Sequence, residues 1–167
     1  MQTIKFNRLN LSNEDFLLDM GCGEGRHSIG AHISTEANIL GFDLSFKDLK
    51  IAKERLNDFD TSQIETICQF ATANIISIPL SDSSLDAVIC SEVLEHVDSP
   101  EESIKELIRV LRPGGVLALS VPRYLPELIC WKLSKEYSKT PGGHVSCLLY
   151  TSPSPRDVEE SRMAGCA

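Results

Sequence analysis

One stretch near the start of the chain decides the fold: Phe16-Leu17-Leu18-Asp19-Met20-Gly21-Cys22-Gly23-Glu24-Gly25-Arg26. The apolar run at its beginning predicts a short buried strand, and the glycines that follow predict a backbone turned tightly against a close neighbour. A helix is expected from Arg26, so its positive dipole end and the free N–H groups of the loop would face one pocket. The stretch therefore predicts a site for a small ligand.

The spacing of the glycines indicates which kind of ligand. A dinucleotide-binding loop reads Gly-x-Gly-x-x-Gly, whereas here the order is Gly-x-Gly-x-Gly, and Arg26 takes the place of the third dinucleotide glycine. Asp19 at the strand tip would repel a pyrophosphate and attract a cationic amino-acid head group. The stretch thus favours a zwitterionic or cationic nucleoside over a nicotinamide dinucleotide.

The stretch resembles the first motif of the class I S-adenosylmethionine-dependent methyltransferases of the type 11 group. The resemblance extends from about Phe16 through Pro122 and rests on four segments that follow one another in the order of the family. It implies a methyltransferase with S-adenosyl-L-methionine as its cofactor. It also implies cofactor contacts from Asp19, Gly21, Cys22, Gly23, Gly25, Asp43, Leu44, Asn74, Ile75, Ser91 and Glu92.

The second segment repeats the strand-and-helix pattern. Residues 38–42 predict a strand that ends at Asp43, and residues 45–56 have the apolar spacing of a helix. An acidic side chain at this strand tip, some two dozen positions after the glycine loop, is placed to accept both ribose hydroxyls. The alternative is that Asp43 caps the following helix, a role that Ser45 could fill instead.

The third segment departs from the family at one position. A strand is predicted over residues 64–70, and the residues after it resemble the family segment that closes over adenine. Asn74 stands where the family usually has Asp. Its amide oxygen can still accept from the adenine amino group, but the hydrogen bond becomes a neutral one.

The fourth segment follows a strand predicted over residues 85–90 and should border the same pocket. His96 is a candidate general base, because imidazole titrates near neutral pH; the alternative is that it packs or orients the loop. Glu92 and Glu95 can contact the pocket or begin a solvated helix, and Glu95 is expected to be the solvated one.

The next elements complete the expected architecture. Residues 100–112 predict a helix that the following Pro and Gly residues stop, and residues 116–121 predict a fifth strand. Alternating strands and helices indicate a doubly wound, Rossmann-like α/β domain with a parallel sheet, strand order 3-2-1-4-5 and the final strands missing.

The region after the fifth strand carries the candidates for the acceptor side. Trp131 and Tyr137 lie on a predicted helix, and His144 follows it. All three are candidates for the acceptor pocket, with His144 a second candidate base; core packing is the alternative for the aromatic residues.

The tail does not fit the expected fold. Residues 146–167 show no sustained strand or helix period, and residues 148–157 resemble translated sequencing-adapter read-through. We therefore expect a methyltransferase domain over residues 1–145, incomplete at its C-terminus, and a non-native or disordered tail over 146–167. Without further strands, the fifth strand would be an exposed apolar edge.

The composition limits the classes of binding partner that are expected. The 167 residues fit one domain, and a formal net charge of -8 argues against nucleic acid and anionic membranes and favours a small-molecule acceptor. The six cysteines form no CxxC pair, no signal peptide or membrane-length apolar run is evident, and no metal ligand set is expected. These features predict reduced thiols in a cytoplasmic protein.

Two other functions stay open on the sequence. A nicotinamide-dependent oxidoreductase shares the topology, although Asp19 and Arg26 count against it. A non-catalytic fragment that only binds the cofactor is the second.

Overall fold

The computed structural model describes residues 4–35, 37–122 and 146–152. Three helices are present, α1 (Arg26–Thr35), α2 (Phe46–Leu56) and α3 (Pro100–Val110), with the 3-10 turns η1 (Phe6–Arg8) and η2 (Leu94–His96) in the described residues. The strands are β1 (Phe16–Met20), β2 (Asn38–Asp43), β3 (Cys68–Thr72), β4 (Leu85–Ser91), β5 (Leu111–Pro122) and β6 (Ser146–Ser152).

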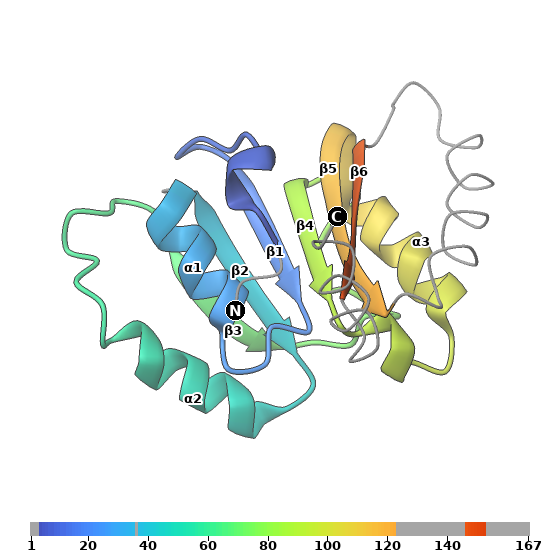
Figure 1. Cartoon of the computed structure of the whole chain (residues 1–167), viewed down its shortest axis with the longest axis horizontal. Coiled ribbons are helices and arrows are strands. Elements are labelled where there is room, and N and C mark those ends of the chain that lie inside the picture. Colours follow the sequence, from blue (N-terminus) through green and yellow to red (C-terminus); the bar gives the residue numbers. More distant parts are fainter. Residues whose placement is uncertain (1–3, 36, 123–145, 153–167) are drawn as a thin grey trace, which may run out of the picture.

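The strands form one parallel sheet in the order β3-β2-β1-β4-β5-β6 (Figure 1). The predicted order 3-2-1-4-5 and the doubly wound class are confirmed. Parallel neighbours need crossover connections, and here α1 and α2 make two of them before the chain crosses from β3 to β4. In the view of Figure 1, α1 and α2 lie at the left of the molecule, and α3 lies at the right, beside β5.

The alternation of side chains along β1 sets the two faces of the sheet. Leu18 belongs to a buried cluster with Ile104 and Leu107 of α3, whereas Leu17 belongs to a second cluster with Ala31 of α1. Because successive strand residues point to opposite faces, Asp19 lies on the same face as Leu17, beneath α1. This places a carboxylate under the glycine loop.

The third strand begins later than predicted. Residues 64–67 are not in the sheet, and β3 starts at Cys68. The N–H of Ile67 donates to the side-chain oxygen of Asn38 (3.3 Å), and the N–H of Ile64 closes a turn on the carbonyl oxygen of Thr61 (2.9 Å). Only one hydrogen bond of the strand ladder reaches this segment, from the N–H of Ile39 to the carbonyl oxygen of Ile67 (2.8 Å), and side-chain and turn hydrogen bonds replace the rest.

The helix after η2 ends earlier than predicted. It stops at Val110, since Leu111 has extended dihedrals (φ -74, ψ 134) and pairs at once with Leu85 of β4. The register then shifts before Val116 pairs with Ala87, so the residues between them form an irregularity in β5.

The sequence predicts no strand in the tail, but the structure has one. Ser146–Ser152 forms β6, which pairs in parallel with β5 from Val116 to Pro122. In this structure β5 is therefore not the edge strand that the sequence suggests. The boundary at residue 145 stays a prediction, and residues 153–167 lie outside the described residues.

Candidate cofactor site

The loops that carry the predicted cofactor residues begin at one edge of the sheet. Met20, the last residue of β1, is in register with Phe42 of β2 and with Cys90 of β4. The start of the next loop is attached to the same edge, because the N–H of Ala73 donates to the carbonyl oxygen of Asp43 (3.2 Å). All four segments therefore meet at the carboxyl ends of the strands, where ligands bind in open parallel sheets.

The three glycines of the loop have different reasons to be glycine. Gly21 (φ +75) has no room for a side chain, since a Cβ there would lie 2.2 Å from Cγ2 of Val93. Gly25 (φ +79) is also crowded, because a Cβ there would lie 2.9 Å from Cβ of Ala52. Gly23 (φ +50) has no atom within 4 Å of that position. Gly21 and Gly25 thus allow other residues to pack closely against the loop, whereas Gly23 leaves open space beside it.

The first N–H groups of the loop are already bonded within the protein. Gly21 and Cys22 both donate to the carbonyl oxygen of Phe42 (2.7 and 3.0 Å), and Gly23 donates to Oδ2 of Asp43 (2.8 Å). The expectation that free loop N–H groups face the pocket is wrong for these residues. A pyrophosphate would find few donors here, which agrees with the glycine spacing.

Asp43 connects the glycine loop to the start of α2. Its Oδ2 accepts from Gly23, and its Oδ1 accepts from the N–H of Ser45 (2.8 Å). The helix cap is Ser45, whose Oγ accepts from the N–H of Asp48 (3.3 Å). Asp43 is therefore not the N-cap, and each of its half-buried oxygens keeps a further lone pair for a hydroxyl donor.

Asp19 is placed under the loop and not on its surface. Its side chain is 1% exposed, and Ser28 of α1 donates to its Oδ2 (2.6 Å). Burial raises the pKa of Asp19 to about 6, and the Ser28 hydrogen bond acts in the opposite direction. A buried carboxylate can attract a cationic ligand through space, and the attraction of a cationic head group stays a prediction.

Two predicted cofactor residues use their side chains for packing. The side chain of Cys22 is buried against Ile29 and Phe70, and Ile75 is buried in the cluster that includes α3 residues. Burial, followed by the nearby charge of Asp19, raises the pKa of the Cys22 thiol. These two residues can offer only backbone groups to a ligand, whereas Leu44 is 64% exposed and has its side chain available.

Asn74 begins a short turn directly after β3. Its Oδ1 accepts from the N–H of Ile76 (3.2 Å), and its carbonyl oxygen accepts from the N–H of Ser77 (3.0 Å). The Asn74 side chain is exposed. Its orientation is therefore set by the backbone, and Oδ1 keeps a second lone pair for an adenine amino group.

The residues after β4 are held by the neighbouring strand. Glu92 has φ +56, and its N–H donates to the carbonyl oxygen of Ser120 (2.9 Å). The hydroxyl of Ser120 donates in turn to Oε1 of Glu92 (2.5 Å). Among the described residues, Oγ of Ser91 is buried without a hydrogen-bond partner. Sequence reasoning missed Ser120, although a serine within the apolar run of residues 116–121 was a signal.

Glu95 is not the solvated residue that the sequence predicts. It is half-buried in η2, and in the described structure its Oε2 is buried without a hydrogen-bond partner. Burial raises its pKa, as does the nearby Glu92, against the opposing charge of His96. His96 itself is exposed at the end of η2. The predicted acceptor residues Trp131, Tyr137 and His144 lie outside the described residues.

The described residues fit S-adenosylmethionine. Space is open above Gly23, the Asp43 oxygens can accept from ribose, and exposed apolar side chains are available for the adenine faces at Leu44 and at Ile76, which is 43% exposed. Sequence reasoning missed Ile76. No three His, Cys, Asp or Glu side chains are grouped to hold a metal ion in the described parts of the chain. Within those same parts, no helix is long and apolar enough to cross a bilayer.

The fold and the site define a class of protein: a doubly wound domain of the kind that binds S-adenosylmethionine at the carboxyl edge of its sheet. Residues 18–119 match the family described as Methyltransferase domain. The chain belongs to this family.

Individual relatives agree with that assignment. Methyltransferase GfsG of Streptomyces halstedii is 30% identical over 115 residues, which are 69% of this chain and 40% of that protein. Demethylmenaquinone methyltransferase of Listeria welshimeri is 30% identical over 133 residues, 78% of this chain and 53% of the relative. The chain thus spans about half or less of the length of these relatives.

Solved structures show the same fold. Geranyl diphosphate methyltransferase in complex with S-adenosylmethionine superimposes with a TM-score of 0.61 at 18% sequence identity, over 95% of this chain and 60% of that one. At this identity the likeness concerns the fold alone.

Proposed function

We propose that this chain binds S-adenosylmethionine at the carboxyl edge of the sheet and transfers its methyl group to a small organic acceptor. The observation that carries the proposal is the connection between Gly23 and Asp43. The carboxylate that would bind ribose also accepts the N–H of the glycine loop (2.8 Å), so the two parts of the site are positioned together. Membership of the methyltransferase-domain family supports the same function.

S-adenosylmethionine supplies an electrophilic methyl group on a sulfonium. The contribution of the protein is to align the acceptor in line with that group and to exclude water, which can supply most of the rate. The glycine loop can hold the amino-acid part, Asp43 the ribose, and the turn at Asn74 the adenine. Few catalytic side chains are needed.

An acceptor whose nucleophile is a hydroxyl group would use a base. His96 and His144 remain the candidates for this role, and His96 is exposed near Glu95, at the edge where the loops gather. For a carbon or amine acceptor, a protein base is not always needed. The acceptor class therefore decides whether a histidine substitution affects turnover.

A small-molecule acceptor is supported by the relatives. The name of the Listeria relative specifies demethylmenaquinone, a quinone, as the molecule it methylates. The net charge of -8 also disfavours a polyanionic nucleic-acid acceptor. We extend only the class, a small organic molecule, to this chain.

Two measurements test the proposal. Calorimetry should detect binding of S-adenosylhomocysteine and not of NAD; the reverse result would favour an oxidoreductase. Incubation with a methyl-labelled donor and a panel of small acids, phenols, quinones and amines should label one class of acceptor. Binding without any turnover would leave a cofactor-binding module.

A further inference from the structure

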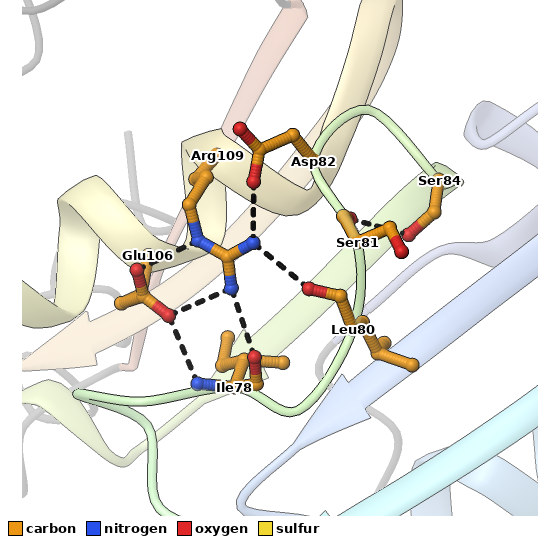
Figure 2. A network of polar contacts seen from close by, with 7 residues as sticks. All are labelled: Ile78, Leu80, Ser81, Asp82, Ser84, Glu106 and Arg109. Carbon is orange, nitrogen blue, oxygen red and sulfur yellow. Dashed lines mark hydrogen bonds and ion pairs between the residues drawn. The ribbon is translucent and has the colours of Figure 1, made fainter.

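Arg109 of α3 makes side-chain hydrogen bonds to the loop between β3 and β4 (Figure 2). In the same loop, the N–H groups of Ser83 and Ser84 donate to the carbonyl oxygens of Arg109 and Val110 (2.9 Å each). Nη1 of Arg109 donates to the carbonyl oxygen of Leu80 (2.8 Å) and to Oδ1 of Asp82 (2.7 Å). Nη2 donates to the carbonyl oxygen of Ile78 (2.8 Å) and to Oε2 of Glu106 (2.9 Å), and Nε donates to Oε1 of Glu106 (2.8 Å). These five hydrogen bonds engage all five N–H donors of the guanidinium.

Glu106 completes the attachment from the same helix. Its Oε2 accepts from the N–H of Ile78 (2.9 Å), so both backbone groups of Ile78 bond to side chains of α3. The charged pair with Arg109 lowers the pKa of Glu106, with the direct hydrogen bond as the largest cause. The Arg109 and Glu106 side chains are only 29% and 21% exposed, which limits competition from water. We call this set of contacts the Arg109 clamp.

The clamp lies at one end of the turn that carries the adenine candidate. This turn, residues 74–77, is held at its start by the hydrogen bond from Ala73 to Asp43 (3.2 Å). Its end is held at Ile78 by the clamp. The exposed residues of the turn, Asn74, Ile76 and Ser77, therefore lie between two fixed points, one at Asp43 and the other at α3.

We propose that the Arg109 clamp positions the Asn74–Ser77 turn for recognition of the adenine base. Arg109 and Glu106 are positioning residues in this scheme, because they act through the turn and touch no ligand. The inference rests on the proposed cofactor function. It gives α3, which packs on the face of the sheet opposite to α1, a role in the selectivity for the purine base.

The geometry explains why the residue must be arginine. Lysine carries the same charge but has a single nitrogen, and it cannot reach two carbonyl oxygens and two carboxylates with fixed angles. An uncharged amide would also leave Glu106 without its charged partner. Both changes remove the fixed hydrogen bonds to the carbonyl oxygens of Ile78 and Leu80, while the apolar packing of Ile75 and Ile78 remains.

The test compares two ligands on one set of variants. The ligands are S-adenosylhomocysteine and its purine analogue, which lacks only the 6-amino group, and the quantity is the ratio of their dissociation constants by calorimetry. We expect the wild type to prefer the adenine ligand about 3- to 10-fold, the range of one neutral hydrogen bond. Arg109→Gln should reduce this ratio toward one. Adding Asn74→Ala to Arg109→Gln should then change the ratio little.

Arg112 provides the matched control. It lies three positions after Arg109 and also pairs with carboxylates, Asp86 and Asp15, but these precede or begin strands at the opposite edge of the sheet. Arg112→Gln should therefore keep the wild-type ratio. A general loss of stability lowers the folded fraction for both ligands equally, so it cannot change the ratio.

Three results separate the possibilities. A wild-type ratio in Arg109→Gln would overturn the positioning role and leave the clamp as a stabilising contact. If Arg109→Gln does not fold, Arg109→Lys provides the same measurement with the same expected fall, and Glu106→Gln, which keeps one acceptor oxygen, should give an intermediate ratio. Failure of the wild type to bind S-adenosylhomocysteine would instead overturn the proposed function on which this inference rests.

Discussion

Replacing Asp43 with Ala tests the centre of the proposed site. The carboxylate bonds to the N–H groups of Gly23 and Ser45 at 2.8 Å each, and the proposal adds two ribose hydroxyls in the complex. Hydrogen bonds to a charged group contribute about 1.5 to 3 kcal/mol. We therefore expect S-adenosylhomocysteine to bind about 10- to 150-fold more weakly to the variant.

The same substitution should also lower stability, by a separate amount. The N–H groups of Gly23 and Ser45 lose their acceptor in the free and in the bound protein alike, so this loss does not enter the dissociation constant. Because the site is half-buried, we expect about 1 kcal/mol for each group, or about 2 kcal/mol in total. Thermal unfolding should report it as a fall in Tm of about 4 to 8 °C.

Calorimetry below the Tm of the variant separates the two effects. Asp43→Asn keeps one acceptor oxygen and should give an intermediate affinity. Asp48→Ala removes a carboxylate from the first turn of the same helix and should leave the affinity unchanged. A lowered Tm with a wild-type dissociation constant for Asp43→Ala would refute the ribose assignment and leave Asp43 as a structural link between the loop and α2.

The remaining predictions concern the loop, the turn, a buried histidine and the tail. Gly21→Ala should destabilise the protein more than Gly23→Ala, by about 1 to 3 kcal/mol in denaturant unfolding, because both have positive φ but only Gly21 lacks room for a methyl group. Asn74→Asp should preserve or tighten cofactor binding, since a charged acceptor replaces a neutral one; a large loss in calorimetry would show that this side chain does not face the adenine amino group. Burial lowers the pKa of His27 to about 4, below its ordinary 6.5, so the unfolded chain takes up the proton first. The contribution of His27 to the free energy of unfolding should decrease as the pH is lowered from about 6.5 to about 4. The pH dependence of unfolding of His27→Gln should lack this decrease. Deletion of residues 146–167 should lower Tm if β6 belongs to the native sheet, whereas an unchanged Tm and cofactor affinity would support the boundary at residue 145.

Much of the fold could be predicted from the sequence because it is written in local patterns. The apolar run before Gly21 and the one before Asp43 are each long enough for a single buried strand, and the alternation with helical spacing permits only a parallel sheet. The boundaries at Cys68 and Val110 could not be predicted, because they depend on hydrogen bonds and pairings with residues far along the chain. The strand β6 was missed because the order of apolar and polar residues in this segment shows no strand period.

The sequence by itself indicated the strand order 3-2-1-4-5 and favoured a cationic nucleoside over a dinucleotide, because glycine spacing and strand-end carboxylates are local features with few physical uses. Only the tertiary structure decided which atoms are available. In the folded chain, Asp19 and the thiol of Cys22 are buried and Glu95 is half-buried. The loop N–H groups donate to the carbonyl oxygen of Phe42 and to the carboxylate of Asp43. The tertiary structure also brought Arg109 of α3 to the turn after β3, some 30 residues earlier in the chain. Burial and long-range hydrogen bonds arise from packing between distant segments, and no local pattern encodes them.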